Sequence, residues 1–442
     1  MSPPRAPARK SGNRRPVARQ ADVPGLSARA AAIDMLDSVL GRARMLDEAR
    51  AQGPAAERAE ARGLADLTLR RLGQIDAALE SFVHRAPPGR GMQILRLMAA
   101  ELLFHGTPPH AAVDMGVRLA QARKGTERLS GMINAVGRRL AENGAEIIAE
   151  QNAPVLNTPE WLGEALVGDW GMDLALAMTS VHATPAPHDL TLKTQADAPA
   201  LARETGGIIL PTGSLRLPGR PQISALPGYA DGAWWVQDAA ASLPAKLLPL
   251  PEDGRVLDIC AAPGGKALQF AAQGAQVTAL DLSEARLLRL QDNLTRTGLE
   301  AETICADALD WQPELPFHAI LLDAPCSATG TIRRHPDLPH RTSGKIDDLV
   351  ALQRRLIDRA VGWLAPGGVL VYCTCSLLKP EGEAQASHMA EHARLDLLPL
   401  TEADGVPSEF ITDNGHLRTR PDFWQDKGGL DGFFAARFRR RP

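Results

Sequence analysis

Residues 252–442 alternate between short apolar segments and amphipathic helical segments, and this order constrains the fold more than any other feature of the chain. The strand-like segments are 255–259, 276–280, 302–305, 319–322 and 369–373, and the helical segments are 265–272, 284–296 and 346–364. Strands that alternate with helices form a mostly parallel, doubly wound sheet. Residues 432–438 predict a late antiparallel strand that closes it. An α/β domain is therefore expected over residues 252–442.

The first half of the chain has a different organisation. Between residues 26 and about 145, apolar residues recur at helical spacing, and breakers at 53–54, 87–89 and 107–109 separate the segments. This pattern predicts an all-α domain at 26–150. Residues 151–251 contain many prolines between short strand-like pieces, which predicts a small α+β connector.

Positively charged residues are concentrated at the N-terminus. The net charge of −3 over 442 residues nevertheless gives no whole-chain signature of a polyanion-binding protein. Residues 1–25 are expected to form a disordered basic arm, either solvated or in contact with nucleic acid. No secretory or membrane-spanning segment is evident. A cytoplasmic protein without membrane contact is expected.

The five cysteines are odd in number and confined to the second half of the chain, at positions 260, 305, 326, 373 and 375. No pair has the C-x-x-C spacing of a zinc site. Reduced thiols and no metal are expected. Cys260, Cys305 and Cys373 are expected to be buried structural residues within strands or tight turns.

The segment 256–266, V-L-D-I-C-A-A-P-G-G-K, predicts a strand, a turn of small residues and the start of a helix. Small residues let the backbone approach a ligand, and free N–H groups at a helix start can hold an anionic group. The dinucleotide motif G-x-G-x-x-G is absent, so a ligand smaller than NAD is expected.

Three acids stand at or just after successive predicted strands. Asp281 is placed to accept hydrogen bonds from a ribose diol, Asp307 to receive an adenine amino group, and Asp323 lies beside both. Each acid alone is more often a helix cap or a loop residue. Together they favour a positively charged nucleoside ligand, and S-adenosylmethionine fits.

Four motifs resemble the RNA 5-methylcytosine methyltransferases of the Nol1/Nop2/Sun family: C-A-A-P-G-G-K at 260–266, L-D-A-P-C-S-A-T-G at 322–330, R-R-H-P-D at 333–337 and Y-C-T-C-S at 372–376. Segments 95–114 and 130–139 resemble the NusB-like RNA-binding domain. Both domains together are similar to the bacterial Sun/Fmu branch, which modifies a cytosine of 16S rRNA. The resemblance implies a NusB-like helical domain, a connector and a Rossmann-like methyltransferase domain.

The resemblance also implies which residues line the S-adenosylmethionine site. They are Asp281, Asp307 and Asp323 with the turn residues Cys260, Ala261, Ala262, Pro263, Gly264, Gly265 and Lys266.

Two thiols, Cys326 and Cys375, follow predicted strands whose ends should meet over one pocket. Methylation of cytosine C5 requires a thiolate that adds to C6, and the residues alone do not rank the two. The P-C pair resembles the nucleophile of DNA cytosine methyltransferases, which would nominate Cys326. Resemblance to the RNA family instead implies that Cys375 attacks and Cys326 releases the product, with Asp323 polarising the cytosine. We follow the RNA family.

The expected partner is RNA, as 16S rRNA or a small ribosomal subunit precursor, and the protein is expected to be a monomer. Arg333, Arg334 and His335 either hold a phosphate beside a flipped cytosine or are ordinary solvated loop residues, and we favour the phosphate. Two alternative functions remain: a tRNA 5-methylcytosine methyltransferase and a non-catalytic RNA-binding assembly factor.

Overall fold

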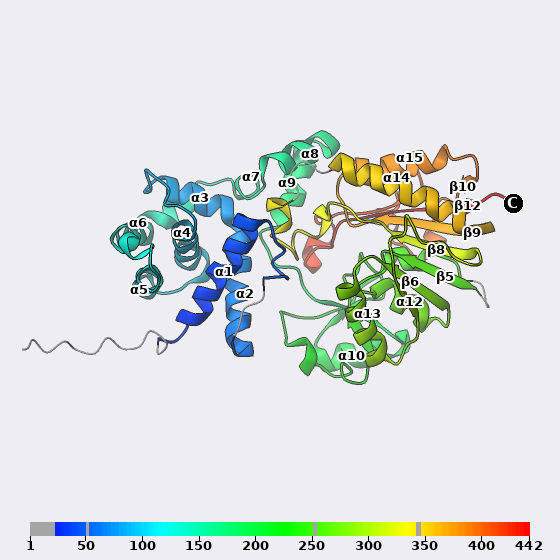
Figure 1. The fold of residues 1–442 in the computed structure, drawn as a ribbon, viewed down its shortest axis with the longest axis horizontal. Helices are drawn as coiled ribbons and strands as arrows, with labels where there is room; N and C mark the ends of the chain where they lie inside the picture. Colours follow the sequence, from blue (N-terminus) through cyan, green and yellow to red (C-terminus); the bar gives the residue numbers. More distant parts are fainter. Residues whose placement is uncertain (1–22, 50–52, 251–253, 342–345) are drawn as a thin grey trace, which may run out of the picture.

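The computed structural model describes residues 23–49, 53–250, 254–341 and 346–442. Helices of the first 150 residues form one lobe, and the large sheet lies at the opposite end of the molecule, where the chain ends (Figure 1). Nearly all of the predicted basic arm lies outside the described residues. No helix in the described ranges is long and apolar enough to cross a membrane.

The N-terminal lobe is all-α, as predicted. Its helices are α1 (Leu26–Arg42), α2 (Ala55–Arg70), α3 (Leu72–Glu80), α4 (Arg90–Ala100), α5 (Pro109–Gln121) and α6 (Ser130–Ala149). Helix α4 is central, with Ile94, Leu95 and Met98 buried in the core of the lobe. A Cβ atom added at Gly116 or Gly137 would lie 2.9 Å from Met98 Sδ, so these glycines allow α5 and α6 to pack closely on α4.

The connector begins with three helices and continues as a small antiparallel sheet of order β2-β3-β1-β4. Its elements are α7 (Ala153–Leu156), α8 (Glu160–Trp170), α9 (Met172–Val181), β1 (Asp189–Leu192), α10 (Ala198–Thr205), β2 (Ile208–Ile209), β3 (Leu215–Arg216), β4 (Trp234–Val236) and α11 (Leu243–Lys246). Trp235 of β4 is buried in the core of the C-terminal domain. The connector sheet is therefore packed against the large sheet domain.

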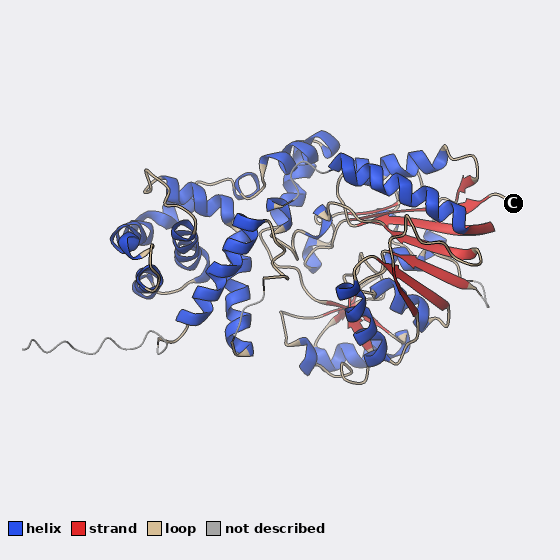
Figure 2. Cartoon of the chain, viewed as in Figure 1, coloured by secondary structure: helices blue, strands red, loops and turns tan. Residues whose placement is uncertain are grey.

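The C-terminal domain contains the predicted parallel sheet, flanked by helices (Figure 2). Its first strands and helices are β5 (Arg255–Ile259), α12 (Gly265–Ala272), β6 (Gln276–Asp281), α13 (Glu284–Thr297), β7 (Glu302–Cys305) and β8 (Phe317–Asp323). They are followed by α14 (Ile346–Trp363), β9 (Leu364–Thr374), α15 (Glu383–Ala390), β10 (Leu395–Leu397), β11 (Leu417–Thr419) and β12 (Phe433–Arg440).

The sheet order is β10-β12-β9-β8-β5-β6-β7, with β11 paired to β12. Strand β12 is antiparallel to β9, as predicted, but it does not close the sheet. It lies inside the sheet because β10 pairs with its other edge. The short strands β10 and β11 were not predicted. Strand β12 runs toward the C-terminus, which lies on the side of the sheet away from the N-terminal lobe (Figure 1). Because β12 is antiparallel to β9, the parallel strands run the other way, and their carboxyl ends face the N-terminal lobe.

Candidate active site

The site lies at the carboxyl ends of β5, β6, β8 and β9. In the parallel register Asp323 of β8 stands opposite Cys373 of β9, and Asp281 of β6 stands opposite Cys305 of β7. The ends of neighbouring parallel strands meet at one edge of the sheet. The topology therefore brings together acids and thiols that lie up to about a hundred residues apart in the sequence.

The turn at 260–266 is held against the end of β6. Asp281 Oδ2 accepts a hydrogen bond of 3.0 Å from the N–H of Ala262, and Oδ1 accepts one of 2.9 Å from the N–H of Ser283. Gly264 has φ +106°, and a Cβ added there would lie 2.1 Å from Leu290 Cδ1. Only glycine meets both requirements. Asp281 thus fixes the turn that was predicted to contact a ligand.

Asp307 lies immediately after β7 and is half-buried. Its Oδ1 accepts a hydrogen bond of 2.8 Å from the N–H of Leu309. The preceding residue, Ala306, donates its N–H to the carbonyl of Asp281 at 3.2 Å. The loop that carries Asp307 is therefore attached to the end of β6, beside Asp281.

Lys266 and Asp323 form an ion pair inside the site. Lys266 Nζ lies 2.7 Å from Asp323 Oδ2, and the side chains are 9% and 30% exposed. Burial acts to lower the pKa of Lys266, but the charge of Asp323, its hydrogen bond to Lys266 and the other acidic groups nearby together outweigh burial, and the pKa is raised. Asp323 also accepts a bond of 3.5 Å from Cys373 Sγ. The pair is a fixed charged group at the centre of the strand ends.

The two candidate thiols are in contact. Cys326 Sγ lies 3.5 Å from Cys375 Sγ, and both residues are partly buried. The N–H of Gly330 donates to the carbonyl of Cys375 at 2.9 Å, which joins the loops that carry them. The pKa of Cys326 lies well above its ordinary value because its thiol is hydrogen-bonded to Cys375 and buried. The hydrogen bond and burial therefore favour the protonated form of Cys326.

The other three cysteines differ from one another. Cys373 is fully buried in β9, as predicted, and burial raises its pKa. Cys260 is partly exposed and adopts φ +61°, and burial of its thiol raises its pKa to about 12. The prediction of a buried Cys305 is wrong, because this residue ends the edge strand β7 and is exposed.

The expectation that Arg333 and Arg334 hold an RNA phosphate is wrong for Arg333. Its side chain is 1% exposed and pairs with Asp238 and Asp431 at 3.0 and 2.7 Å. Arg334 pairs with the same two carboxylates and is 19% exposed. These acids come from the connector and from the segment before β12, so the motif joins parts of this chain. His335 remains partly exposed.

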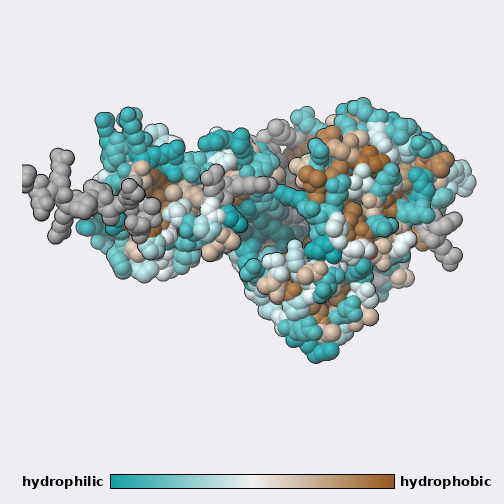
Figure 3. Space-filling model, turned by 60° about the horizontal axis from the view of Figure 1, so that its bottom comes forward, coloured by the Kyte–Doolittle hydropathy of each residue, from teal (hydrophilic) through white to brown (hydrophobic). Residues whose placement is uncertain are grey.

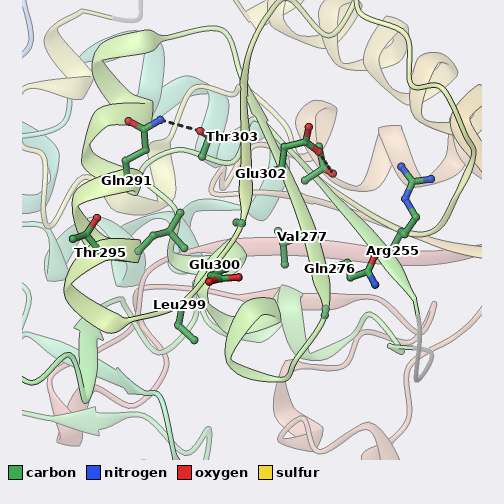
Figure 4. A pocket seen from close by; sticks show the side chains of 13 residues that line it. Arg255, Gln276, Val277, Gln291, Thr295, Leu299, Glu300, Glu302 and Thr303 are labelled. Atoms are coloured by element: carbon green, nitrogen blue, oxygen red, sulfur yellow. Dashed lines mark hydrogen bonds between the residues drawn. The ribbon is translucent and has the colours of Figure 1, made fainter.

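A cavity of about 480 Å³ lies between the connector, the turn and the Lys266–Asp323 pair. Its lining residues include Tyr229, Trp235, Ala262, Pro263, Lys266, Asp323, Arg334 and His335. A larger, open hollow of about 790 Å³ lies at the amino-terminal ends of β5, β6 and β7. Its labelled side chains include Gln291, which is hydrogen-bonded to Thr303 (Figure 4). The candidate acids and thiols are at the opposite ends of the strands, on the side of the smaller cavity. The turn, Lys266 and Asp323 line this cavity, whereas Asp281, Asp307 and the two thiols are not among its lining residues.

Comparison with known proteins identifies both domains. Residues 245–439 match the model of the 16S rRNA methyltransferases RsmB/F, and residues 26–142 match that of the NusB family. A protein of Xanthomonas campestris pv. campestris named ribosomal RNA small subunit methyltransferase B is 38% identical over 438 residues, which are 93% of this chain and 97% of the relative. The chain belongs to the RsmB/F family of 16S rRNA methyltransferases. It is therefore an S-adenosylmethionine-dependent rRNA methyltransferase.

Solved structures share the fold of this RsmB/F family member. The crystal structure of PH0851 covers 94% of this chain and 99% of its own, with a TM-score of 0.71 and 24% identity. A methyltransferase homolog protein from Pyrococcus horikoshii covers 62% of this chain and 93% of its own, with a TM-score of 0.53 and 27% identity. The similarity to PH0851 extends over the N-terminal lobe, the connector and the C-terminal domain.

Sequence analysis missed Asp258, although an acid inside an otherwise apolar strand is an unusual signal. This residue of β5 is fully buried, and neither carboxylate oxygen makes a hydrogen bond of good geometry among the described residues. Burial raises the pKa of Asp258 to about 8, against the opposing effects of the Lys266 charge and of the nearby N–H of Ala267. A buried carboxyl with only this weak donor beside the turn fits a ligand that brings its own donors. The ammonium group of S-adenosylmethionine is such a donor.

Proposed function

We propose that this enzyme methylates C5 of a cytosine in 16S rRNA through a covalent bond between Cys375 and C6 of the base. The observation that carries the proposal is the contact between Cys375 and Cys326, 3.5 Å apart, at strand ends that also hold the Lys266–Asp323 pair. A lone thiol would favour a structural role. Two thiols in contact beside a buried ion pair favour covalent chemistry.

The reaction needs a covalent step because C5 of cytosine is a poor nucleophile. Addition of the Cys375 thiolate to C6 forms a C–S bond and gives C5 the reactivity of an enamine. S-adenosylmethionine, when bound, would supply the methyl group: its sulfonium S–CH3 bond would break and the neutral thioether S-adenosylhomocysteine would leave. C5 forms the new C–C bond, and loss of the C5 proton to a base then drives elimination of the thiolate, which breaks the C–S bond. The enzyme is thereby restored.

The two thiols have different roles in this scheme. The thiol of Cys326, whose protonated form is favoured, lies beside the attacking sulfur, and we assign to it the release of the product. Asp323 contacts the cytosine as well as the cofactor and is held by Lys266. The turn 260–266 with Asp281 and Asp307 holds the cofactor, and Asp258 receives its ammonium group.

An rRNA substrate is supported by three features. The Xanthomonas relative is named as a ribosomal RNA small subunit methyltransferase. The NusB family model matches the N-terminal lobe. The molecule is also hollowed between the N-terminal lobe and the remainder, and hydrophilic residues gather in this hollow (Figure 3). A hydrophilic hollow suits a polar substrate such as RNA better than an apolar ligand.

Bisulfite sequencing of 16S rRNA and tRNA from a deletion strain tests this function. The proposal predicts loss of one methylated cytosine in 16S rRNA, which returns with the wild-type gene and does not return with Cys375→Ser. Loss in tRNA alone would make the enzyme a tRNA methyltransferase. No loss in either RNA would favour a non-catalytic assembly factor.

A further inference from the structure

Glu381 is a fully buried carboxylate that the reaction scheme does not use. It precedes α15 and contacts residues next to the two cysteines. Its carboxylate accepts four hydrogen bonds. Oε1 accepts from the N–H of Ser327 at 2.9 Å and from Gln353 Nε2 at 3.1 Å. Oε2 accepts from the hydroxyls of Ser327 and Ser376 at 2.5 and 2.6 Å. Every partner is a donor, so an ionised carboxylate satisfies the whole set.

The partners of Glu381 are the immediate neighbours of both thiols. Ser327 follows Cys326, and Ser376 follows Cys375. Gln353 of α14 also donates to the carbonyl of Pro325 at 3.0 Å, directly before Cys326. One carboxylate therefore connects the loop after β8, the loop after β9 and a helix that covers the sheet.

The backbone of Glu381 is fixed as firmly as its side chain. Its carbonyl accepts a hydrogen bond of 2.7 Å from the hydroxyl of Tyr372, which is fully buried in β9. A buried acceptor held at both ends sets the distance between the groups that donate to it. Through Ser327 and Ser376, this arrangement joins the two loops that carry the sulfur atoms.

The charge of Glu381 also acts on the thiols through space. It is one of the causes that raise the pKa of Cys326, after the hydrogen bond to Cys375, burial and the charge of Cys375. A nearby negative charge disfavours a second one. Glu381 therefore favours the state in which Cys326 keeps its proton.

We propose that Glu381 is a positioning residue that holds the two cysteine loops in register through Ser327 and Ser376, so that the Cys375 sulfur is placed for attack and Cys326 for release. This proposal rests on the assignment of Cys375 and Cys326 to covalent catalysis. Glu381 touches neither thiol in the hydrogen-bond network and acts through Ser327 and Ser376. It would affect the chemical step rather than the binding of RNA or cofactor.

The test compares full-length wild type with Glu381→Gln, which keeps the size of the side chain and removes its charge. Methylation kinetics with 16S rRNA give kcat and KM, and iodoacetamide alkylation between pH 6 and 10 is mapped to each cysteine by mass spectrometry. We expect kcat to fall about tenfold or more. Alkylation of Cys326 should begin about one pH unit lower than in wild type. KM for RNA and cofactor should stay within about twofold.

Glu391→Gln is the matched control, because Glu391 is an exposed residue at the end of α15. It should behave as wild type in both measurements. Unchanged kcat in Glu381→Gln would overturn the proposal. A lower kcat with an unchanged Cys326 profile, or loss of folding, would assign Glu381 a structural role and would also overturn it.

A separate measurement distinguishes this inference from the proposed function. The Cys326→Ala protein is incubated with RNA and S-adenosylmethionine and examined for a covalent adduct. If the adduct forms while Glu381→Gln behaves as wild type, the positioning role alone fails. If no adduct forms, the covalent mechanism itself fails.

Discussion

Two buried carboxyl groups in the catalytic domain show how differently the same side chain can be used. Glu381 accepts four hydrogen bonds, whereas Asp258 makes no hydrogen bond of good geometry among the described residues. Neither was predicted, because apolar periodicity identifies a buried strand but not the function of an acid within or after it. Cys326, Cys375 and Asp323 were predicted together because each follows a strand, and the structure places them at one edge of the sheet.

Asp258 gives a prediction about stability and pH. Its pKa is about 8 in the folded chain, so it is protonated at pH 6 and releases its proton on unfolding. The stabilisation of the folded state by this bound proton is complete below about pH 4. It is lost as the pH rises to about 8, at roughly 1.4 kcal/mol of the free energy of unfolding per pH unit. Asp258→Asn should therefore show a smaller decrease in melting temperature between pH 6 and pH 8 than the cofactor-free wild type.

Exposed Asp310→Asn serves as the control for this measurement and should retain the wild-type decrease. Differential scanning calorimetry at three or four pH values is sufficient. Equal decreases in wild type and Asp258→Asn would show that the carboxyl of Asp258 does not titrate in this range.

At the scale of elements, prediction succeeded where the sequence pattern is local and failed where a partner strand is needed. Helices separate β5 from β6, β6 from β7 and β8 from β9, and this alternation was sufficient to predict a parallel sheet, although β7 and β8 are joined without a helix. Strands β10 and β11 have three residues each and no pattern of their own. They are ordered by pairing with β12, which no local signal contains. For the same reason β12 was placed at the edge of the sheet rather than inside it.

The turn before α12 gives a prediction at this scale. Gly264→Ala would place a Cβ 2.1 Å from the buried side chain of Leu290, so the turn must shift. Because the turn is assigned to the cofactor, binding of S-adenosylmethionine should weaken by about tenfold or more. Isothermal titration calorimetry measures this affinity directly.

Gly274→Ala is the control that separates the effect of the clash with Leu290 from the effect of backbone strain at a positive φ. Gly274 also has a positive φ, +83°, but a Cβ added there meets nothing within 4 Å. This variant should lose about 1 kcal/mol of stability while its cofactor affinity stays within about twofold of wild type. Equal losses of affinity in the two variants would place the effect in general destabilisation.

At the scale of the whole molecule, segment 333–341 attaches the catalytic domain to the N-terminal lobe. Arg70 of α2 donates to the carbonyl of Arg333 at 2.9 Å, and Asp337 accepts the buried N–H of Leu46 at 3.0 Å. From the sequence, this motif favours RNA contact because arginines suit phosphates, but that pattern does not reveal its partners in the chain. These partners are Asp238 and Asp431, which lie almost a hundred residues away on either side and reach Arg333 only in the folded chain.

Substitution of Asp337 tests whether segment 333–341 holds the catalytic domain and the N-terminal lobe together. Asp337→Ala leaves the N–H of Leu46 without its acceptor, which should cost about 1–3 kcal/mol at the interface. Hydrogen exchange in the peptide that contains Leu46 should become faster, while exchange in β5 and β8 stays as in wild type. Exposed Asp413→Ala provides the control. Unchanged exchange at Leu46 in Asp337→Ala would mean that this contact does not hold the lobes.

The covalent role of Cys375 is tested most directly by trapping the adduct. Full-length Cys326→Ala and Cys375→Ala are incubated with 16S rRNA and S-adenosylmethionine and separated on a denaturing gel that detects protein bound to RNA. We predict an adduct that survives denaturation in Cys326→Ala, where release is blocked, and none in Cys375→Ala, where the attacking thiol is missing. An adduct in Cys375→Ala with none in Cys326→Ala would contradict this account and exchange the roles of the two thiols.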